Sequence, residues 1–119
     1  WHGNMKPIRV KFSSEAEEVY KHVNAQAPKS KLERMILNAV NQKIELIKAN
    51  PHYGDGIPKN LIPKEYIIKY EITNLFRVEL PNFWRMLYTL KGDKIEIVAF
   101  VLDILDHPTY DKKFGYRKN

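Results

Sequence analysis

The feature that most restricts the fold of this chain is a pair of alternating segments on either side of a short turn. Apolar and polar side chains alternate over residues 75–80 and again over residues 84–90, and Pro81-Asn82-Phe83 separates the two segments. A period of two predicts half-buried strands, and the short turn predicts an antiparallel hairpin. The hydrophobic pattern selects the register that pairs Leu80 with Trp84, because a shift by one residue would mix charged and aromatic side chains on both faces.

This register separates two faces of the predicted sheet. It places Arg77 opposite Leu87 and Glu79 opposite Arg85. The predicted core face holds Phe76, Val78, Leu80, Trp84, Met86, Tyr88 and Leu90. A tight Gly92-Asp93 loop would pair Leu90 with Ile95 and add Ile97, Ala99 and Val101 to the core face. The opposite face is expected to expose Arg77, Glu79, Arg85, Leu87, Phe100 and Leu102, with Arg9 and Lys11 beside them.

The N-terminal half predicts one strand and two helices. Residues 7–12 alternate as a half-buried strand. A Ser with a Glu three residues later stands at Ser14 and again at Ser30, and this spacing is typical of a helix start. Apolar side chains at helical spacing then predict a helix over residues 14–26 and a longer one that ends at Asn50-Pro51.

Three further elements complete the prediction. Residues 52–63 are interpreted as a loop, followed by a single helical turn over residues 63–70 with Tyr66, Ile67 and Tyr70 turned inward. An apolar strand covers residues 95–105, and a short helical tail begins at Asp106-His107-Pro108. The fold class is therefore α+β: a strand, a two-helix hairpin, a three-stranded antiparallel meander and a short C-terminal helical tail, with the helices on one face of the sheet. A chain of 119 residues fits a single domain, expected over residues 5–119, with residues 1–4 a cloning remnant or a disordered extension.

Composition narrows the function classes. The absence of cysteine excludes disulfides and thiolate metal sites, and no apolar run approaches the roughly 20 residues of a membrane-spanning helix. We therefore expect a cytoplasmic protein without a membrane partner. The net charge of +6 favours a polyanionic partner, RNA or DNA before a membrane.

The expected exposed face has three interpretations. Guanidinium groups beside the Phe100 ring suit phosphate binding and base stacking. A partner chain that covers the face would equally explain its apolar side chains. In the third interpretation, Arg85 and Glu79 form an ordinary surface pair across the strands.

Three short stretches together resemble one family of proteins. They are Leu-Phe-Arg-Val at residues 75–78, Trp-Arg-Met-Leu-Tyr at residues 84–88 and His-Pro-Thr-Tyr-Asp-Lys at residues 107–112. In this order and spacing they resemble the RelE/ParE toxin superfamily, and the ending is most similar to the HigB-like branch. The resemblance extends over residues 5–116 and implies a RelE-like domain.

The resemblance implies a cytoplasmic toxin of a type II toxin–antitoxin system, with a cognate antitoxin protein as partner. Such toxins are typically endoribonucleases that cut mRNA on the ribosome. The resemblance therefore implies that this protein is an enzyme. The alternatives are a ParE-like toxin that binds gyrase without cutting, an inactive RelE-fold module that binds RNA or antitoxin, and a generic RNA-binding domain. Ribosome dependence, sequence preference and oligomeric state stay open.

RNA cleavage without a metal needs a base, cations on the phosphate and an acid for the leaving oxygen. The expected catalytic residues are Arg77 and Arg85 as a phosphate clamp, His107 as acid or base, and Tyr110 as a base-stacking or phosphate-binding group. The expected RNA-binding residues are Lys59, Lys64, Arg9, Lys11 and Phe100. No cofactor and no metal site are predicted.

Each of these residues also has a structural interpretation. His107 is equally able to cap the tail helix, Tyr110 to pack in the core, and Lys59 and Lys64 to be solvated loop lysines. The chain also departs from the family, whose members commonly carry a further arginine where this chain has Asp103 and Asp106. Carboxylates there would repel phosphate unless one of them acts as the base or orients His107.

Overall fold

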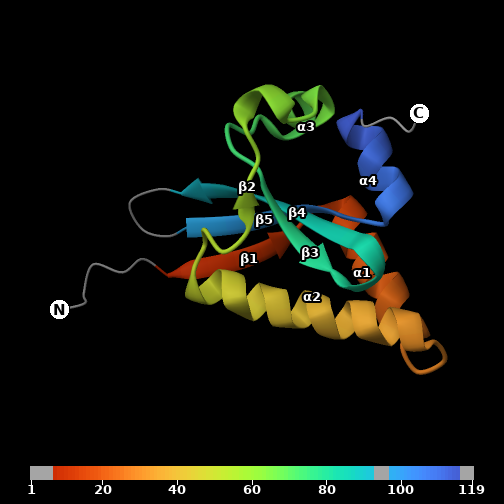
Figure 1. Ribbon diagram of the computed structural model, residues 1–119. Helices are drawn as coiled ribbons and strands as arrows, with labels where there is room; N and C mark the ends of the chain where they lie inside the picture. The colour runs from red at the N-terminus through yellow and green to blue at the C-terminus, as the bar shows by residue number, and fades with distance from the viewer. Residues whose placement is uncertain (1–6, 93–96, 116–119) are drawn as a thin grey trace.

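A five-stranded mixed sheet forms the centre of the domain (Figure 1). The computed structural model describes residues 7–92 and 97–115. In chain order the elements are β1 (Ile8–Phe12), α1 (Ser14–Gln26), α2 (Lys31–Ala49), β2 (Asp55–Gly56), the 3-10 turn η1 (Lys59–Leu61), α3 (Lys64–Tyr70), β3 (Phe76–Leu80), the turn η2 (Pro81–Phe83), β4 (Trp84–Gly92), β5 (Ile97–Leu105) and α4 (His107–Phe114). The α+β class is confirmed. Residues 1–4 lie outside the described residues, so the domain limits 5–119 stay a prediction.

Serine caps begin both long helices. Ser30 caps α2 as predicted, with its Oγ accepting a hydrogen bond from the Glu33 amide at 3.5 Å. At α1 the cap is Ser13 rather than Ser14: its Oγ accepts from the Ala16 amide at 3.0 Å and donates to the Leu102 carbonyl at 2.6 Å. The second bond ties the start of α1 to β5, which a local sequence pattern does not reveal.

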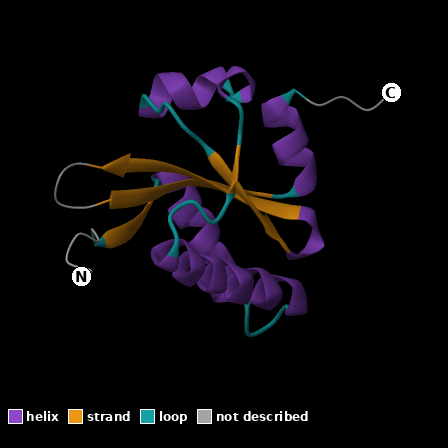
Figure 2. Cartoon of the chain, turned by 60° about the vertical axis from the view of Figure 1, so that its left-hand side comes forward, coloured by secondary structure: helices purple, strands orange, loops and turns teal. Residues whose placement is uncertain are grey.

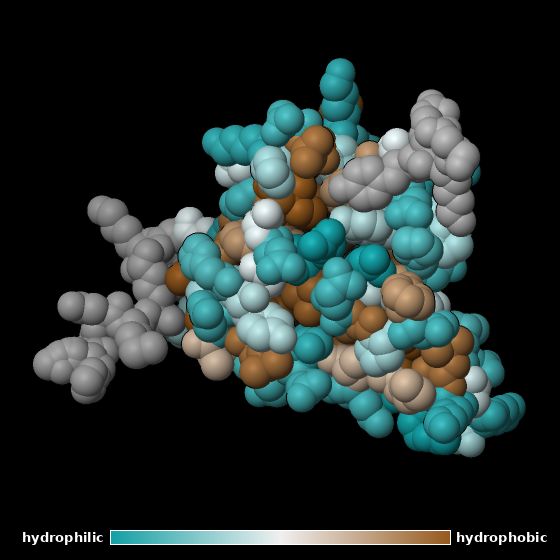
Figure 3. Space-filling model, viewed as in Figure 1, coloured by the Kyte–Doolittle hydropathy of each residue, from teal (hydrophilic) through white to brown (hydrophobic). Residues whose placement is uncertain are grey.

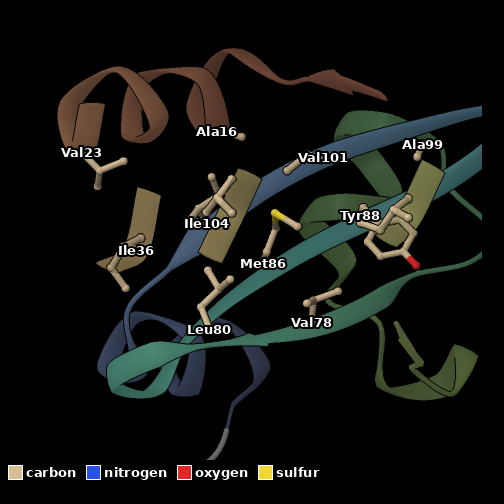
Figure 4. Close-up of a cluster of buried hydrophobic side chains, with 12 residues drawn as sticks. Ala16, Val23, Ile36, Val78, Leu80, Met86, Tyr88, Ala99, Val101 and Ile104 are labelled. Carbon is tan, nitrogen blue, oxygen red and sulfur yellow. The ribbon is translucent and has the colours of Figure 1, made fainter. Parts of the chain in front are cut away.

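Helices α1 and α2 pack on one face of the sheet and form the main core with it (Figure 4). The fully buried members include Ala16, Ile36, Val40, Ile47, Met86, Tyr88, Ala99 and Val101. Burial of each large apolar side chain contributes about 1.5–3 kcal/mol relative to an exposed one. The apolar stripe of α2 is therefore the side of the helix that packs in this core.

The predicted register of β3 and β4 is confirmed. Leu80 pairs with Trp84, Glu79 with Arg85, and Arg77 with Leu87. The turn between the strands holds two residues with left-handed backbone angles, Asn82 at φ 59° and Phe83 at φ 62°. A bulky residue in this region carries strain on the order of 1 kcal/mol or more.

The predicted register of β4 and β5 is wrong. Leu90 pairs with Ala99 rather than Ile95, and Gly92 is a strand residue that pairs with Ile97. The predicted tight loop also involves Asp93, which lies outside the described residues. Because the displacement is an even number of residues, Ala99 and Val101 keep their place on the core face. An irregularity at Leu87 and Tyr88 leaves Leu102 as an extra residue of β5, so Ile104 rather than Asp103 reaches the main core beyond it.

The sheet contains more than the predicted meander. Strands β3, β4 and β5 are antiparallel, but β1 pairs with β5 in parallel and β2 pairs with the outer edge of β3. The strand order is β1-β5-β4-β3-β2. Neither additional pairing could be predicted from local patterns. The parallel pair joins strands from opposite ends of the chain, and the two-residue β2 is too short to show an alternating pattern.

Helices cover both faces of the sheet, so the prediction that they lie on one face is wrong (Figure 2). Helices α3 and α4 lie on the face opposite α1 and α2 and form a second core with it. Its buried members are Ile62, Tyr66, Ile72, Leu75, Leu87, Leu102, Leu105 and Tyr110. Leu87 and Leu102, expected on an exposed face, are both 0% exposed. Of the residues predicted to face inward on α3, Tyr66 is buried, whereas Ile67 is exposed.

The remaining apolar surface is divided. On the side drawn in Figure 3, hydrophobic residues form separate patches among hydrophilic ones. Across residues 7–92 and 97–115, no helix has the length and apolar character needed to cross a membrane.

Candidate functional site

Two arginines on adjacent strands converge on one tyrosine of α4. The Arg77 Nη1 atom donates a hydrogen bond to the Tyr110 hydroxyl at 3.3 Å. The Arg85 guanidinium lies over the Tyr110 ring, 5.1 Å from its centroid. The hydrogen bond with Tyr110 raises the pKa of Arg77, so this guanidinium stays charged. The structure therefore brings together three of the predicted site residues.

Two exposed carboxylates flank the arginine pair. Glu79 lies between the arginines, with Arg77 Nε 3.4 Å and Arg85 Nε 3.2 Å from its oxygens. Asp55 lies 3.6 Å from Arg77 Nη2. Within the described part of the chain, neither Nε atom has a hydrogen-bond partner of good geometry. The Glu79 and Asp55 side chains are 56% and 73% exposed, so all three ion pairs are in contact with water and are weak.

Asp55 is a site residue that the sequence analysis missed. It reaches Arg77 because β2 pairs with β3, with Asp55 directly opposite Arg77. Tyr88 fixes the loop before β2: its hydroxyl donates to the Pro51 carbonyl at 2.7 Å and accepts from the Gly54 amide at 2.9 Å. A Cβ atom at Gly54 would lie 3.0 Å from the Arg77 carbonyl oxygen, so a side chain there would displace the strand. The sequence pattern that could have indicated this close approach is a glycine, Gly54, immediately before the acidic Asp55.

A cavity of about 390 Å³ and a smaller one of about 120 Å³ lie on different sides of this region. The smaller one belongs to the site, because Asp55, Arg77, Tyr110 and Phe114 line it. The larger one lies between α1 and the end of β5 and contains neither arginine. A small anionic group that enters the smaller cavity meets Arg77 directly.

His107 lies at the edge of the site, at the first position of α4. Its Nε2 atom is 3.3 Å from Asp111 Oδ2, and its ring lies 5.9 Å from the Phe83 ring. The Nδ1 atom is buried and has no hydrogen-bond partner among the described residues. A proton on Nε2 points to Asp111 in this arrangement. Asp111, which the sequence analysis did not select, is therefore the group that orients His107.

Asp103 and Asp106 have other roles. The Asp103 carboxylate is buried and accepts a hydrogen bond from the Tyr66 hydroxyl at 2.6 Å, and burial raises its pKa. Asp106 caps α4 by accepting from the Thr109 amide at 3.0 Å. In the described part of the chain, neither residue forms an ion pair with Arg77 or Arg85. The repulsion of phosphate expected from these two residues therefore does not arise by direct contact.

Three predicted RNA-binding residues lie apart from the arginine pair. Arg9 and Lys11 are on β1, at the other edge of the sheet, three strand spacings or about 14 Å from β3. Phe100 packs edge-to-face against the Tyr70 ring, with centroids 5.7 Å apart, and is part of the second core. Helix α3 covers the sheet face that was expected to be continuous.

The two predicted loop lysines are both exposed. Lys59 is in η1, where its neighbours Pro58 and Leu61 line the small cavity. Lys64 is at the first position of α3. The position of Lys59 suits contact with a ligand that extends beyond the cavity.

No three His, Asp or Glu side chains within residues 7–92 and 97–115 come together in a way that would hold a metal ion.

Comparison with known proteins gives the fold. No family model matches the chain, and no curated protein matches it. A solved structure, the YoeB/ParE toxin from Agrobacterium tumefaciens, matches with a TM-score of 0.56 over 83% of this chain and 98% of that chain, at 13% sequence identity. The chain therefore shares the fold of that structure. At this identity the likeness concerns the arrangement of elements and not the chemistry of the site.

Proposed function

We propose that this protein is a cytoplasmic toxin of a type II toxin–antitoxin system and a metal-independent endoribonuclease that cleaves mRNA. The observation that carries the proposal is the convergence of Arg77 and Arg85 on Tyr110, beside a cavity that Arg77 lines. Planar guanidinium groups bind the oxygens of a phosphodiester through paired hydrogen bonds. The toxin fold supports the same function.

In the proposed reaction the ribose 2′-oxygen attacks the adjacent phosphorus. The bond between phosphorus and the 5′-oxygen of the next nucleotide breaks, which leaves a 2′,3′-cyclic phosphate and a 5′-hydroxyl. The 2′-hydroxyl proton passes to a base and the departing 5′-oxygen receives a proton from an acid. No external co-reactant is needed, because attack and departure conserve the electron pairs.

The residues divide these tasks. Arg77 and Arg85 stabilise the charge that develops on the phosphate oxygens. In this proposal the exposed carboxylate of Asp55, 3.6 Å from Arg77, accepts the 2′-hydroxyl proton. Tyr110 or His107 then supplies the proton for the leaving oxygen. Binding of the phosphate displaces Glu79 from the arginines, which its exposure permits.

The first test combines growth with RNA analysis. Induced expression should arrest growth and produce mRNA fragments with 5′-hydroxyl ends. Arg85→Ala should abolish both effects, and Arg85→Lys should restore little activity, because a single ammonium does not reproduce the guanidinium fork. Lys29→Ala, which removes a charge from the exposed connection between α1 and α2, is the matched control and should keep full activity.

Thermal unfolding of each purified variant separates loss of function from loss of fold. Toxicity that is unchanged in folded Arg77→Ala, Arg85→Ala and His107→Ala proteins would refute the proposed nuclease. Lys59→Ala and Lys64→Ala should weaken RNA binding without removing cleavage, since both side chains are exposed and neither contacts the arginine pair in the described part of the chain.

A second candidate is a ParE-like toxin that binds DNA gyrase and cuts nothing. One observation favours it: Glu79 and Asp55 balance the charges of Arg77 and Arg85, as in a structural ion-pair network. Inhibition of gyrase supercoiling by the purified protein, with intact mRNA in arrested cells, would establish this alternative.

The proposal includes a cognate antitoxin as protein partner. Co-expression of the neighbouring small open reading frame should neutralise the growth arrest, and the two proteins should co-purify. Whether cleavage requires the ribosome is tested by comparing naked mRNA with a translating extract.

A further inference from the structure

The turn between β3 and β4 contains an aromatic residue that the proposed phosphate chemistry does not use. Phe83 is 69% exposed and adopts a left-handed backbone conformation at φ 62°. Its neighbour Asn82 is also left-handed, at φ 59°. Glycine or asparagine would satisfy this backbone with less strain, and a polar side chain would suit the exposure better. Strain combined with an exposed ring indicates a functional constraint at Phe83.

Two contacts, one to the Phe83 carbonyl and one to its ring, hold this residue beside the site. The Arg85 Nη1 atom donates a hydrogen bond to the Phe83 carbonyl, so the strained residue is bonded to one of the two arginines. The His107 ring lies 5.9 Å from the Phe83 ring with the planes at 50°. Figure 1 shows this turn beside the start of α4. An aromatic surface made by Phe83 and His107 is therefore next to a phosphate-binding group.

We propose that Phe83 and His107 form a subsite that stacks an unpaired nucleobase of single-stranded RNA. The inference rests on the proposed function, because it places the base of a nucleotide whose phosphate Arg85 holds. Every nucleobase has a flat π face, so stacking on an exposed ring requires no particular sequence. The juxtaposition of a guanidinium with an aromatic pair matches the two parts of a nucleotide, a phosphate and a ring.

The contacts of His107 agree with this role. Asp111 lies 3.3 Å from Nε2, and Nδ1 is buried. The side chain as a whole is 43% exposed, so its ring can also contact a ligand, in addition to the proton transfer proposed above. Stacking uses the face of the ring, and the Asp111 pair holds the ring at one angle.

The test measures binding to a short single-stranded RNA that is 2′-O-methylated throughout and therefore not cleavable by 2′-oxygen attack. The oligomer carries one 2-aminopurine, whose fluorescence falls when the base stacks. We expect quenching with the wild-type protein, and about a tenfold weaker affinity together with loss of quenching in Phe83→Gly. Phe83→Trp should retain both. Tyr53→Ala, which removes another exposed ring, beyond the end of α2, should bind as the wild type does.

Stability separates a binding role from a structural one. Because Phe83→Gly removes left-handed strain and little buried surface, the variant should unfold at an equal or higher temperature than the wild type while it binds RNA less tightly. Lower stability with unchanged RNA affinity would overturn the subsite. An oligomer with an abasic nucleotide in place of 2-aminopurine should bind both proteins equally if base stacking is the interaction lost.

The outcomes also separate this inference from the proposed function. Loss of binding in Arg85→Ala but not in Phe83→Gly refutes the subsite alone. Wild-type protein that shows Phe83-dependent quenching but cleaves no RNA refutes the nuclease and supports the subsite. Absence of RNA binding by the wild type refutes both.

Discussion

Substitution of Leu87 by alanine tests whether the second face of the sheet is covered. An exposed leucine can be shortened at almost no cost, with surface substitutions usually within about 0.5 kcal/mol. Leu87 is instead 0% exposed and belongs to the core that α3 and α4 form with the sheet. Removal of three carbon atoms there loses about 0.8 kcal/mol per methylene and leaves a cavity as well. We therefore expect Leu87→Ala to lower the free energy of unfolding by about 3 kcal/mol.

The assay is urea unfolding followed by circular dichroism, with a thermal melt beside it. For a domain of this size, 3 kcal/mol corresponds to a fall in Tm of about 10–20 °C. Leu61→Ala is the matched control, because Leu61 is 49% exposed in η1 and the same atoms are removed. Equal stability of the two variants would mean that α3 and α4 do not pack on this face, and the account of the site built on α4 would fail with it.

Three further substitutions test single contacts. Burial raises the pKa of Asp103 from its ordinary 3.8, so the ionised carboxylate destabilises the fold, and this loss of stability develops as the pH rises through the raised pKa. Asp103→Asn should therefore be more stable than the wild type in unfolding experiments at pH 7. The difference should vanish below a pH of about 4. Ser13→Ala removes the α1 cap and the bond to the Leu102 carbonyl, and should lower the free energy of unfolding by about 1–2 kcal/mol in urea. Glu79→Gln removes the carboxylate between the two arginines and should raise affinity for a non-cleavable RNA several-fold in a filter-binding assay; unchanged affinity would show that phosphate does not compete for that position.

Local patterns predicted the parts of the fold that local interactions determine. Helix α1 is bounded by a serine cap and the start of a proline-containing link, and the hydrophobic stripe of α2 has one consistent helical face. The β3–β4 register follows from parity, because only one alignment keeps the apolar side chains together. These features depend on residues close in the sequence.

The remaining features depend on contacts between distant segments. The parallel pairing of β1 with β5 joins residues 8–12 to residues 97–101, and nothing in either strand specifies that partner. The second core could be predicted only in part: Tyr66 was expected to turn inward, but the place of this core over the sheet depends on how α3 folds back. For the same reason Leu87 was assigned to solvent.

The candidate site shows the same division. Arg77 and Arg85 could be placed on one face from register alone, whereas Asp55 reaches Arg77 through a two-residue strand that has no pattern. Tyr110 has the packing role that the sequence analysis offered as one alternative, because it is 2% exposed in the second core, and its hydroxyl also accepts from Arg77. Its role in base stacking or phosphate binding stays a prediction.

The charge of the whole chain is a poor measure of this site. The chain carries +6, but the two arginines are accompanied by two carboxylates within ion-pair distance, so the local charges balance. A phosphate that binds there does not find an excess of positive charge. It has to replace Glu79 as the partner of guanidinium groups that are already oriented. The exposed carboxylates lose little when they return to water, whereas Arg85, with its side chain 13% exposed, would otherwise leave a buried charge unpaired. In the proposed function, exchange of one anion for another on fixed cations allows a nearly neutral cluster to bind RNA, and it predicts that orientation rather than net charge determines affinity.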